Sequence, residues 1–192
     1  GNCVIPIFDA MTKKKVESVL YCIDSNDYQP DKLYGVYDWI HFDQIAWYRK
    51  QSAHFASCNN GRPLPSLAFF HIPLLEYNEL IGDGKTFGND REGGVASSKV
   101  NSGIFASFLD RKDVMGVFAG HDHDNDYVGI NKRILLGYGR VTGADAYGEL
   151  IRGARIIELY EGEFKFDTWI ATLSGREAIY YYPSGLNSDE ER

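Results

Sequence analysis

The chain has 192 residues, 44% of them hydrophobic and 24% charged, a composition that supports one packed domain and excludes intrinsic disorder. The formal net charge of −7 argues against nucleic acid as a partner, because a phosphate backbone binds to a basic face. No apolar run approaches the roughly 20 residues that a membrane span needs. A phosphorylated small substrate remains compatible with this charge, since a bound metal ion can supply positive charge locally.

The first part of the chain alternates between strand and helix patterns. Its predicted elements are an edge strand at 3–8, a strand at 15–23, a loop at 24–33, a helix at 39–57 and a buried strand at 65–72. Pro6 indicates the edge position, because proline cannot donate to a strand ladder. Helical spacing of Ile45, Tyr48 and Ser52 supports the helix, which the Asn59-Asn60-Gly61 segment ends.

The second part contains more strands and fewer helices. Its predicted elements are a glycine-rich loop at 82–98, a short helix at 100–109, a buried strand at 114–119, strands at 127–130, 133–138, 154–160 and 164–170, and a frayed acidic tail at 185–192. This order predicts an α/β fold with a layered mixed sheet and flanking helices. We expect the strands at 66–71 and 114–120 to be central, with the 40–57 helix on one face.

Three cysteines, Cys3, Cys22 and Cys58, are widely spaced and form no C-x-x-C motif, so neither a zinc knuckle nor a redox motif is indicated. Their odd number leaves at least one thiol free or paired outside the chain. They can also be small buried hydrophobic residues, and the compartment does not follow from them. A start at Gly1 without a basic and apolar leader predicts no signal peptide.

Three of the five histidines stand where apolar strands end. His71 closes one strand, and His121 and His123 follow another directly after Gly120. Residues at i and i+2 of an extended segment project to one side, so both imidazoles can reach one small volume. Imidazoles beside carboxylates suit zinc, manganese, iron or nickel. A solvated acidic turn without metal is the alternative interpretation.

The acidic residues after these histidines have a second, supporting role in this interpretation. Asp122, Asp124 and Asp126 can orient the imidazoles. Asn125 and Asp126 are assigned to the turn that supports the metal loop, through bonds to their own backbone. His41 and His54 are expected to be surface or packing residues of the helix.

Several segments together resemble the calcineurin-like metallophosphoesterases, in the branch of the purple acid phosphatase-like phosphohydrolases. They are LAFFHIPLLEY (67–77), NSGIF (101–105), DVMGVFAGHDHDNDYVG (113–129), LLGYGRVTG (135–143) and RGARIIEL (152–159). The resemblance implies a dinuclear centre of Fe, Mn or Zn, in which His71 and His121 share one metal and His123 binds the other. It also implies hydrolysis of a phosphomonoester or phosphodiester.

The sequence lacks the first three motifs of that family. D-x-H and G-D-x-x-D do not occur, and Asn2 is followed by Cys3 where the third motif has histidine. Residues 1–192 therefore resemble a C-terminal half, with the bridging aspartate and the general acid expected upstream. We expect the half-domain to be inactive alone, to bind metal weakly or not at all, and to lack a second sheet.

Several partners follow from this interpretation. They are a phosphorylated small-molecule substrate, the missing N-terminal half and a second copy associating through an exposed apolar face. The resemblance also suggests export or a cell-envelope location. A non-catalytic binding or scaffolding module on the same fold is the alternative function.

Overall fold

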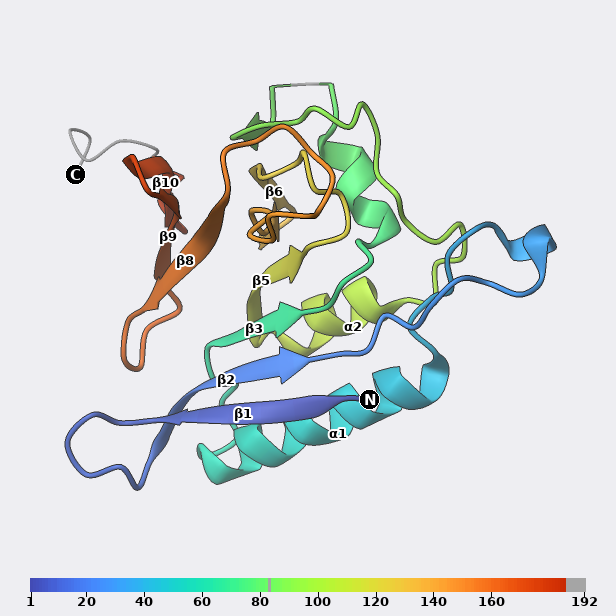
Figure 1. Ribbon diagram of the computed structural model, residues 1–192. Coiled ribbons are helices and arrows are strands. Elements are labelled where there is room, and N and C mark those ends of the chain that lie inside the picture. Colours follow the sequence, from blue (N-terminus) through green and yellow to red (C-terminus); the bar gives the residue numbers. More distant parts are fainter. Residues whose placement is uncertain (83, 186–192) are drawn as a thin grey trace.

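The computed structural model describes residues 1–82 and 84–185 and contains a mixed sheet of seven strands (Figure 1). Four strands, β2, β3, β5 and β7, run parallel, so their carboxyl ends share one edge. Connections between such strands pass over the faces of the sheet, which places their loops beyond its ends. In spatial order the strands are β1 (Cys3–Phe8), β2 (Val16–Cys22), β3 (Ser66–Phe69), β5 (Val114–Ala119), β7 (Ile134–Tyr138), β6 (Val128–Asn131) and β4 (Thr86–Phe87).

Helices cover one face of this sheet. α1 (Phe42–Cys58) and α2 (Ile104–Arg111) pack there, and the apolar side chains of Ile45, Tyr48 and Phe108 are buried against the strands. Buried Asp113, just before β5, accepts hydrogen bonds from the hydroxyls of Tyr21 (3.1 Å) and Tyr48 (2.5 Å). The central strands and the helix on one face are therefore as the sequence predicted.

A second sheet covers part of the other face. It consists of β8 (Gly153–Leu159), β9 (Phe166–Thr172) and β10 (Gly175–Tyr182), in the order β10-β9-β8. Phe166 and Tyr180 of this sheet pack with Leu67, Met115 and Phe118 of the larger one. The expectation that the second sheet lies wholly in a missing half is wrong, because these strands already form a second layer.

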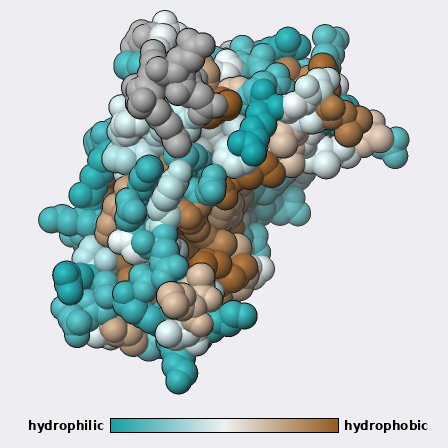
Figure 2. Space-filling model, turned by 90° about the vertical axis from the view of Figure 1, so that its left-hand side faces the viewer, coloured by the Kyte–Doolittle hydropathy of each residue, from teal (hydrophilic) through white to brown (hydrophobic). Residues whose placement is uncertain are grey.

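The remainder of that face is open over β1 and β2. Residues paired across two strands point to the same side, so Ile5 lies with Leu20, and Ile7 lies with Ser18. Val19 and Tyr21, which alternate with Ser18 and Leu20 along β2, face the helices. Ile5 and Ile7 therefore lie on the opposite, open side. Ile5 is 45% exposed and Ile7 37%. Figure 2 shows hydrophobic surface gathered in a band within a hollow on one side of the molecule.

Some elements were not predicted. They are the 3-10 helices η1 (Lys32–Tyr34) and η2 (Leu75–Leu80), the two-residue β4 inside the expected loop 82–98, and β10. Of the expected tail, residues 186–192 lie outside the described residues. Within the described ranges, no helix has the length and apolarity needed to cross a membrane.

Candidate functional site

Two histidines meet at the carboxyl edge of the parallel strands. His71 follows β3, and His121 follows the neighbouring strand β5. The Gly120 amide donates to the His71 carbonyl at 3.1 Å, which continues the pairing of the two strands to the histidines. His71 Nε2 lies 2.9 Å from His121 Nδ1. Strand order therefore brings together two residues that are fifty positions apart in the sequence.

Neighbouring groups set the charge state of this pair. Desolvation by the surrounding protein lowers the pKa of His71, and His121 and His123 lower it further. Asp122 has the opposite effect on the pKa of His71. A lowered pKa favours the neutral imidazole at neutral pH, the form that has a free lone pair for a ligand.

Aromatic side chains from a distant loop border the histidine pair. The ring of Tyr37 contacts His121 edge-on, with the centroids 4.7 Å apart. Tyr28 stacks on Tyr37 at 5.6 Å and is itself exposed. The loop between β2 and α1 therefore reaches the edge of the site.

His123 has a separate environment. Its ring stacks on Tyr147 with the centroids 4.1 Å apart, and its Nδ1 lies 3.2 Å from the Tyr147 carbonyl oxygen. The Tyr147 hydroxyl also accepts from the His123 amide and donates to the His121 carbonyl, both at 3.2 Å. Tyr147 therefore fixes the backbone between the two histidines.

The acidic residues of the same turn bind partners other than the imidazoles. Asp122 is buried and accepts from the Tyr138 hydroxyl at 2.6 Å and from the Ala96 amide at 3.2 Å. Asp124 accepts from the amides of Glu149 (2.6 Å) and Leu150 (3.1 Å). These bonds attach the turn to two other loops, whereas we expected the carboxylates to orient the histidines.

Asn125 and Asp126 hold the turn in place, through a neighbouring loop and not through their own backbone. Asn125 Oδ1 accepts from the amides of Arg91 (2.9 Å) and Glu92 (3.1 Å). Asp126 Oδ1 accepts from the Asn89 amide at 2.6 Å. Both side chains are fully buried, so these bonds are shielded from water.

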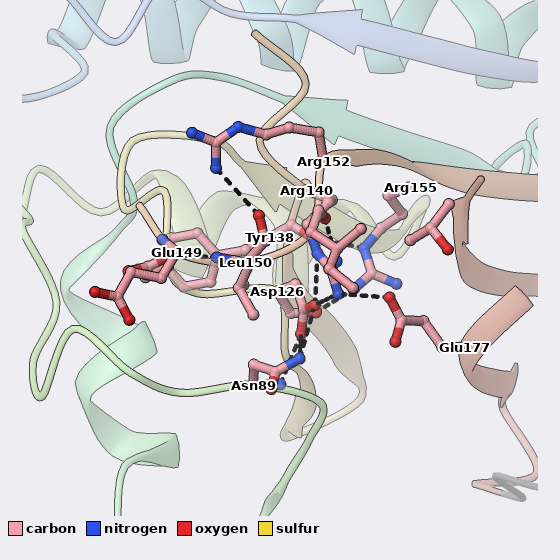
Figure 3. A network of polar contacts seen from close by, with 12 residues as sticks. Asn89, Asp126, Tyr138, Arg140, Glu149, Leu150, Arg152, Arg155 and Glu177 are labelled. Carbon is pink, nitrogen blue, oxygen red and sulfur yellow. Dashed lines mark hydrogen bonds and ion pairs between the residues drawn. The ribbon is translucent and has the colours of Figure 1, made fainter. Parts of the chain in front are cut away.

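Asp126 is also the centre of a buried charge network (Figure 3). Arg140 donates to it through Nε at 2.8 Å and through a second guanidinium nitrogen, and Arg140 also pairs with Glu177 at 3.0 Å. Arg155 donates to the Asp126 carbonyl oxygen. Burial lowers the pKa of Arg155 to about 10, an effect that Asp126 opposes and Arg140 adds to.

The histidine pair fits part of a metal site. Two nitrogens bound to one tetrahedral metal at about 2.0–2.1 Å lie about 3.3 Å apart, so the hydrogen-bonded pair at 2.9 Å needs to open by only about 0.4 Å. A stable site needs three or four protein ligands. Across residues 1–82 and 84–185, no group of three or more His, Cys, Asp or Glu side chains could hold a metal ion.

Two hollows lie beside the histidines. The larger, about 490 Å³, opens between the two sheets and is bordered by His71, Phe118 and Ile157. The smaller, about 250 Å³, is bordered by Asp122 and His123. Arg140 borders both, so the charge network forms part of their common wall.

The two remaining histidines lie on α1 or at its start. His41 precedes the helix and pairs with Asp38 at 3.1 Å, and His54 is exposed on the helix. Tyr37, Tyr147 and Arg140 also border the site and were not predicted from the sequence. Arg140 follows the buried strand β7, so it stands at a strand end like the histidines, and this was the signal available for it.

Comparison with known proteins gives several relatives and no matching family model. The chain is 36% identical over 174 residues to "Probable inactive purple acid phosphatase 29" and 38% identical over 174 residues to "Probable inactive purple acid phosphatase 28", both from Arabidopsis thaliana. These alignments cover 86% and 88% of the chain but 44% and 43% of the relatives. It is 33% identical over 205 residues to "Phosphatase DCR2" of Saccharomyces cerevisiae, covering 98% of the chain and 34% of that protein.

The chain thus spans less than half the length of these relatives. The similarity agrees with the mixed α/β sheet and its flanking helices. The chain belongs to the purple acid phosphatase-like metallophosphoesterase family and corresponds to one part of its members.

Proposed function

We propose that the chain is the C-terminal, histidine-bearing part of a metal-dependent phosphohydrolase that cleaves phosphomonoesters or phosphodiesters. The observation that supports this most strongly is the His71–His121 pair, whose nitrogens lie 2.9 Å apart at the edge of the sheet. The word phosphatase in the names of the relatives supports the reaction class, and the histidine pair supports a location for it in this chain.

Each histidine has a defined role in this proposal. His71 and His121 would hold one metal, and His123 would hold the second, as Fe, Mn or Zn. The metal ions, when bound, polarise the phosphoryl oxygens and offset their negative charge. Asn125 and Asp126 keep the turn that carries His121 and His123 attached to the 89–92 loop.

The described residues supply too few ligands for two metals, so the chain alone is expected to be inactive or nearly so. An N-terminal part of the same domain would supply the bridging aspartate and the general acid. The open face over β1 and the groove of about 490 Å³ are where this part would pack, because both expose apolar side chains and the groove also borders His71.

A binding or scaffolding module is the second candidate, and two relatives carry the word inactive in their names. It is not favoured. The similarity of the chain to a protein named as a phosphatase, over 98% of its length, supports the hydrolase part instead.

The test is a longer chain. The reading frame upstream of Gly1 is cloned with residues 1–192, and turnover of p-nitrophenyl phosphate and bis(p-nitrophenyl) phosphate is measured with added zinc, manganese or iron. The proposal expects turnover that His121→Ala lowers by at least about 100-fold, as loss of a metal ligand does. His54→Ala, an exposed histidine on α1, is the matched control and should leave the rate unchanged.

Two results would contradict the proposal. An upstream frame without metal-ligand motifs would favour the binding module. Full turnover by residues 1–192 alone would show that the chain does not depend on a second part.

A further inference from the structure

The two cysteines at the start of the sheet are direct cross-strand neighbours. β1 is the edge strand and pairs antiparallel with β2, and Cys3 is opposite Cys22 in this register. Residues opposite each other in an antiparallel pair carry their side chains on the same face, with Cβ atoms about 4.5–5.5 Å apart. Both cysteines are free thiols in the structure.

The same register identifies the face on which the thiols lie. Cys3 and Ile5 alternate with Val4, which packs against the helix-side core, so Cys3 is on the open face. Cys3 is exposed, and Cys22 is half-buried beside it. In residues 1–192, where no second part covers this face, water and small reagents can therefore reach Cys3 without any change of fold.

The surrounding contacts hold the two strands in this register. Asn2 Oδ1 accepts from the Asp24 amide at 2.9 Å, immediately beyond the cysteine pair. The strand ends are thus joined on the outer side of the thiols, and the ladder joins them on the inner side.

Disulfide geometry is within reach of this arrangement. A disulfide requires Cα atoms 4.4–6.8 Å apart and Cβ atoms about 3.5–4.5 Å apart, so the strands need to move together by about an ångström or less. Burial raises the pKa of the Cys22 thiol, and its neighbour Cys3 raises it further, which agrees with direct contact between the two groups.

We propose that Cys3 and Cys22 are a redox-sensitive pair that closes into an intramolecular disulfide when the open face meets a mild oxidant such as glutathione disulfide. The Cys3 thiolate attacks one sulfur of glutathione disulfide and releases one glutathione thiolate. The Cys22 thiolate then attacks the Cys3 sulfur of this mixed disulfide and releases the second. Two electrons pass from the cysteine pair to glutathione disulfide, and the two thiol protons end on the two glutathione molecules.

Cys58 provides an internal comparison. It is the last residue of α1 and is also exposed and free, but it has no cysteine opposite it in any strand ladder. Exposure alone would make Cys58 as reactive as Cys3. A disulfide that forms between Cys3 and Cys22 while Cys58 stays reduced would therefore result from the pairing of β1 with β2.

The experiment oxidises the whole chain in a glutathione redox buffer and follows it by mass spectrometry and thiol titration. The expected product is a monomer that has lost two hydrogen atoms, with titratable thiols falling from three to one. Proteolysis should give one linked peptide pair that contains Cys3 and Cys22. Cys58→Ser should oxidise at the same rate, and Cys22→Ser should stop at a glutathione adduct on Cys3.

Thermal unfolding provides a second measurement. The link closes a loop of about 20 residues, so the oxidised chain should unfold at a temperature higher by roughly 5–10 °C, and reduction should reverse the shift. Three results would overturn the proposal: disulfide-linked dimers as the main product, equal glutathione adducts on Cys3 and Cys58 without closure, or a lower unfolding temperature for the linked chain.

Discussion

His71 Nε2 and His121 Nδ1 lie 2.9 Å apart because the strands that precede them, β3 and β5, are adjacent and parallel. The backbone hydrogen bond from the Gly120 amide to the His71 carbonyl aligns the two segments where they leave the sheet. The resemblance implied that His71 and His121 share one metal, and the structure brings their ring nitrogens together.

The first prediction concerns metal binding by this pair. Residues 1–192 should bind zinc or manganese weakly at neutral pH, because the described residues offer two or three ligands where a stable site uses three or four. Titration calorimetry measures the affinity. His71→Ala and His121→Ala should each remove the heat signal, and His54→Ala should preserve it. Tight binding of two metal ions by residues 1–192 would contradict the proposal that this chain supplies only part of the metal ligands.

The second prediction concerns the buried charge network. Asp126→Asn removes the buried carboxylate partner of Arg140, whose side chain is 1% exposed, and leaves it only the half-exposed Glu177. Removal of one member of a buried ion pair should lower the free energy of unfolding by about 3–5 kcal/mol. Urea denaturation measures this. The control is Asp110→Asn, which breaks an exposed pair with Arg49 and should cost about 0–1 kcal/mol.

A third prediction concerns the turn between β1 and β2. Asp9 accepts from the amides of Thr12 (2.5 Å), Lys14 (3.0 Å) and Lys15 (3.0 Å), and these bonds hold its pKa well below the ordinary value. Because the pKa is lower in the folded state, the stabilisation is complete above about pH 4–5 and is lost as the pH falls below about 4.

Urea denaturation between pH 2 and pH 6, in steps of about half a unit, tests this dependence. The wild-type chain should lose stability towards acid more steeply than Asp9→Asn, which keeps the side-chain shape but cannot ionise. Asp145→Asn, a change in an exposed loop, should leave the slope as in the wild type. Identical slopes for all three chains would show that Asp9 contributes nothing.

A fourth prediction concerns the loop that Asn125 holds. Asn125→Ala removes the acceptor of the Arg91 and Glu92 amides, so hydrogen exchange at these two amides should accelerate by about 10-fold or more. In the longer, active chain the same change should lower turnover by about 10–100-fold. Asn78→Ala, which removes an exposed bond to the Leu75 carbonyl, should alter neither quantity.

The fifth prediction concerns self-association. Without a covering segment, the apolar side of β1 should bring two copies together at high concentration, because Ile5 and Ile7 are exposed on the edge strand of the sheet. Sedimentation should show dimers that Ile5→Lys removes. Leu33→Lys is the control, since Leu33 is 82% exposed on the loop between β2 and α1. A monomer at every concentration would contradict the prediction.

Local patterns were sufficient to predict the central elements. β3 and β5 are short, continuous apolar runs, and α1 has helical spacing of its buried residues, so each is visible within its own segment. β10 was missed because it begins with Gly175, Arg176 and Glu177 and a register shift follows, with Ala178 at a φ of 51°. This irregularity breaks the alternation that identifies a strand.

The site was predictable only where its residues follow a strand directly. His71 and His121 could be placed together from strand order. The partners of Asn125 lie in the 89–92 loop, and Tyr37 reaches His121 from a loop more than eighty residues earlier. Such pairings depend on loop paths, and a single sequence does not determine these paths.

At this edge of the sheet, the strands set the spacing of the histidines, and separate loops supply the side chains around them. Hydrogen bonds from Gly120 to His71 and from Gly139 to Ala119 fix the spacing of the histidines through main-chain atoms, and only proline at a donor position would remove them. The loops that border them contribute Tyr37 and Tyr147 from outside the sheet. Insertions in those loops can therefore change which molecules approach the histidines while the spacing of the pair is inherited intact, which leaves selectivity free to diverge among descendants of one ancestral sheet.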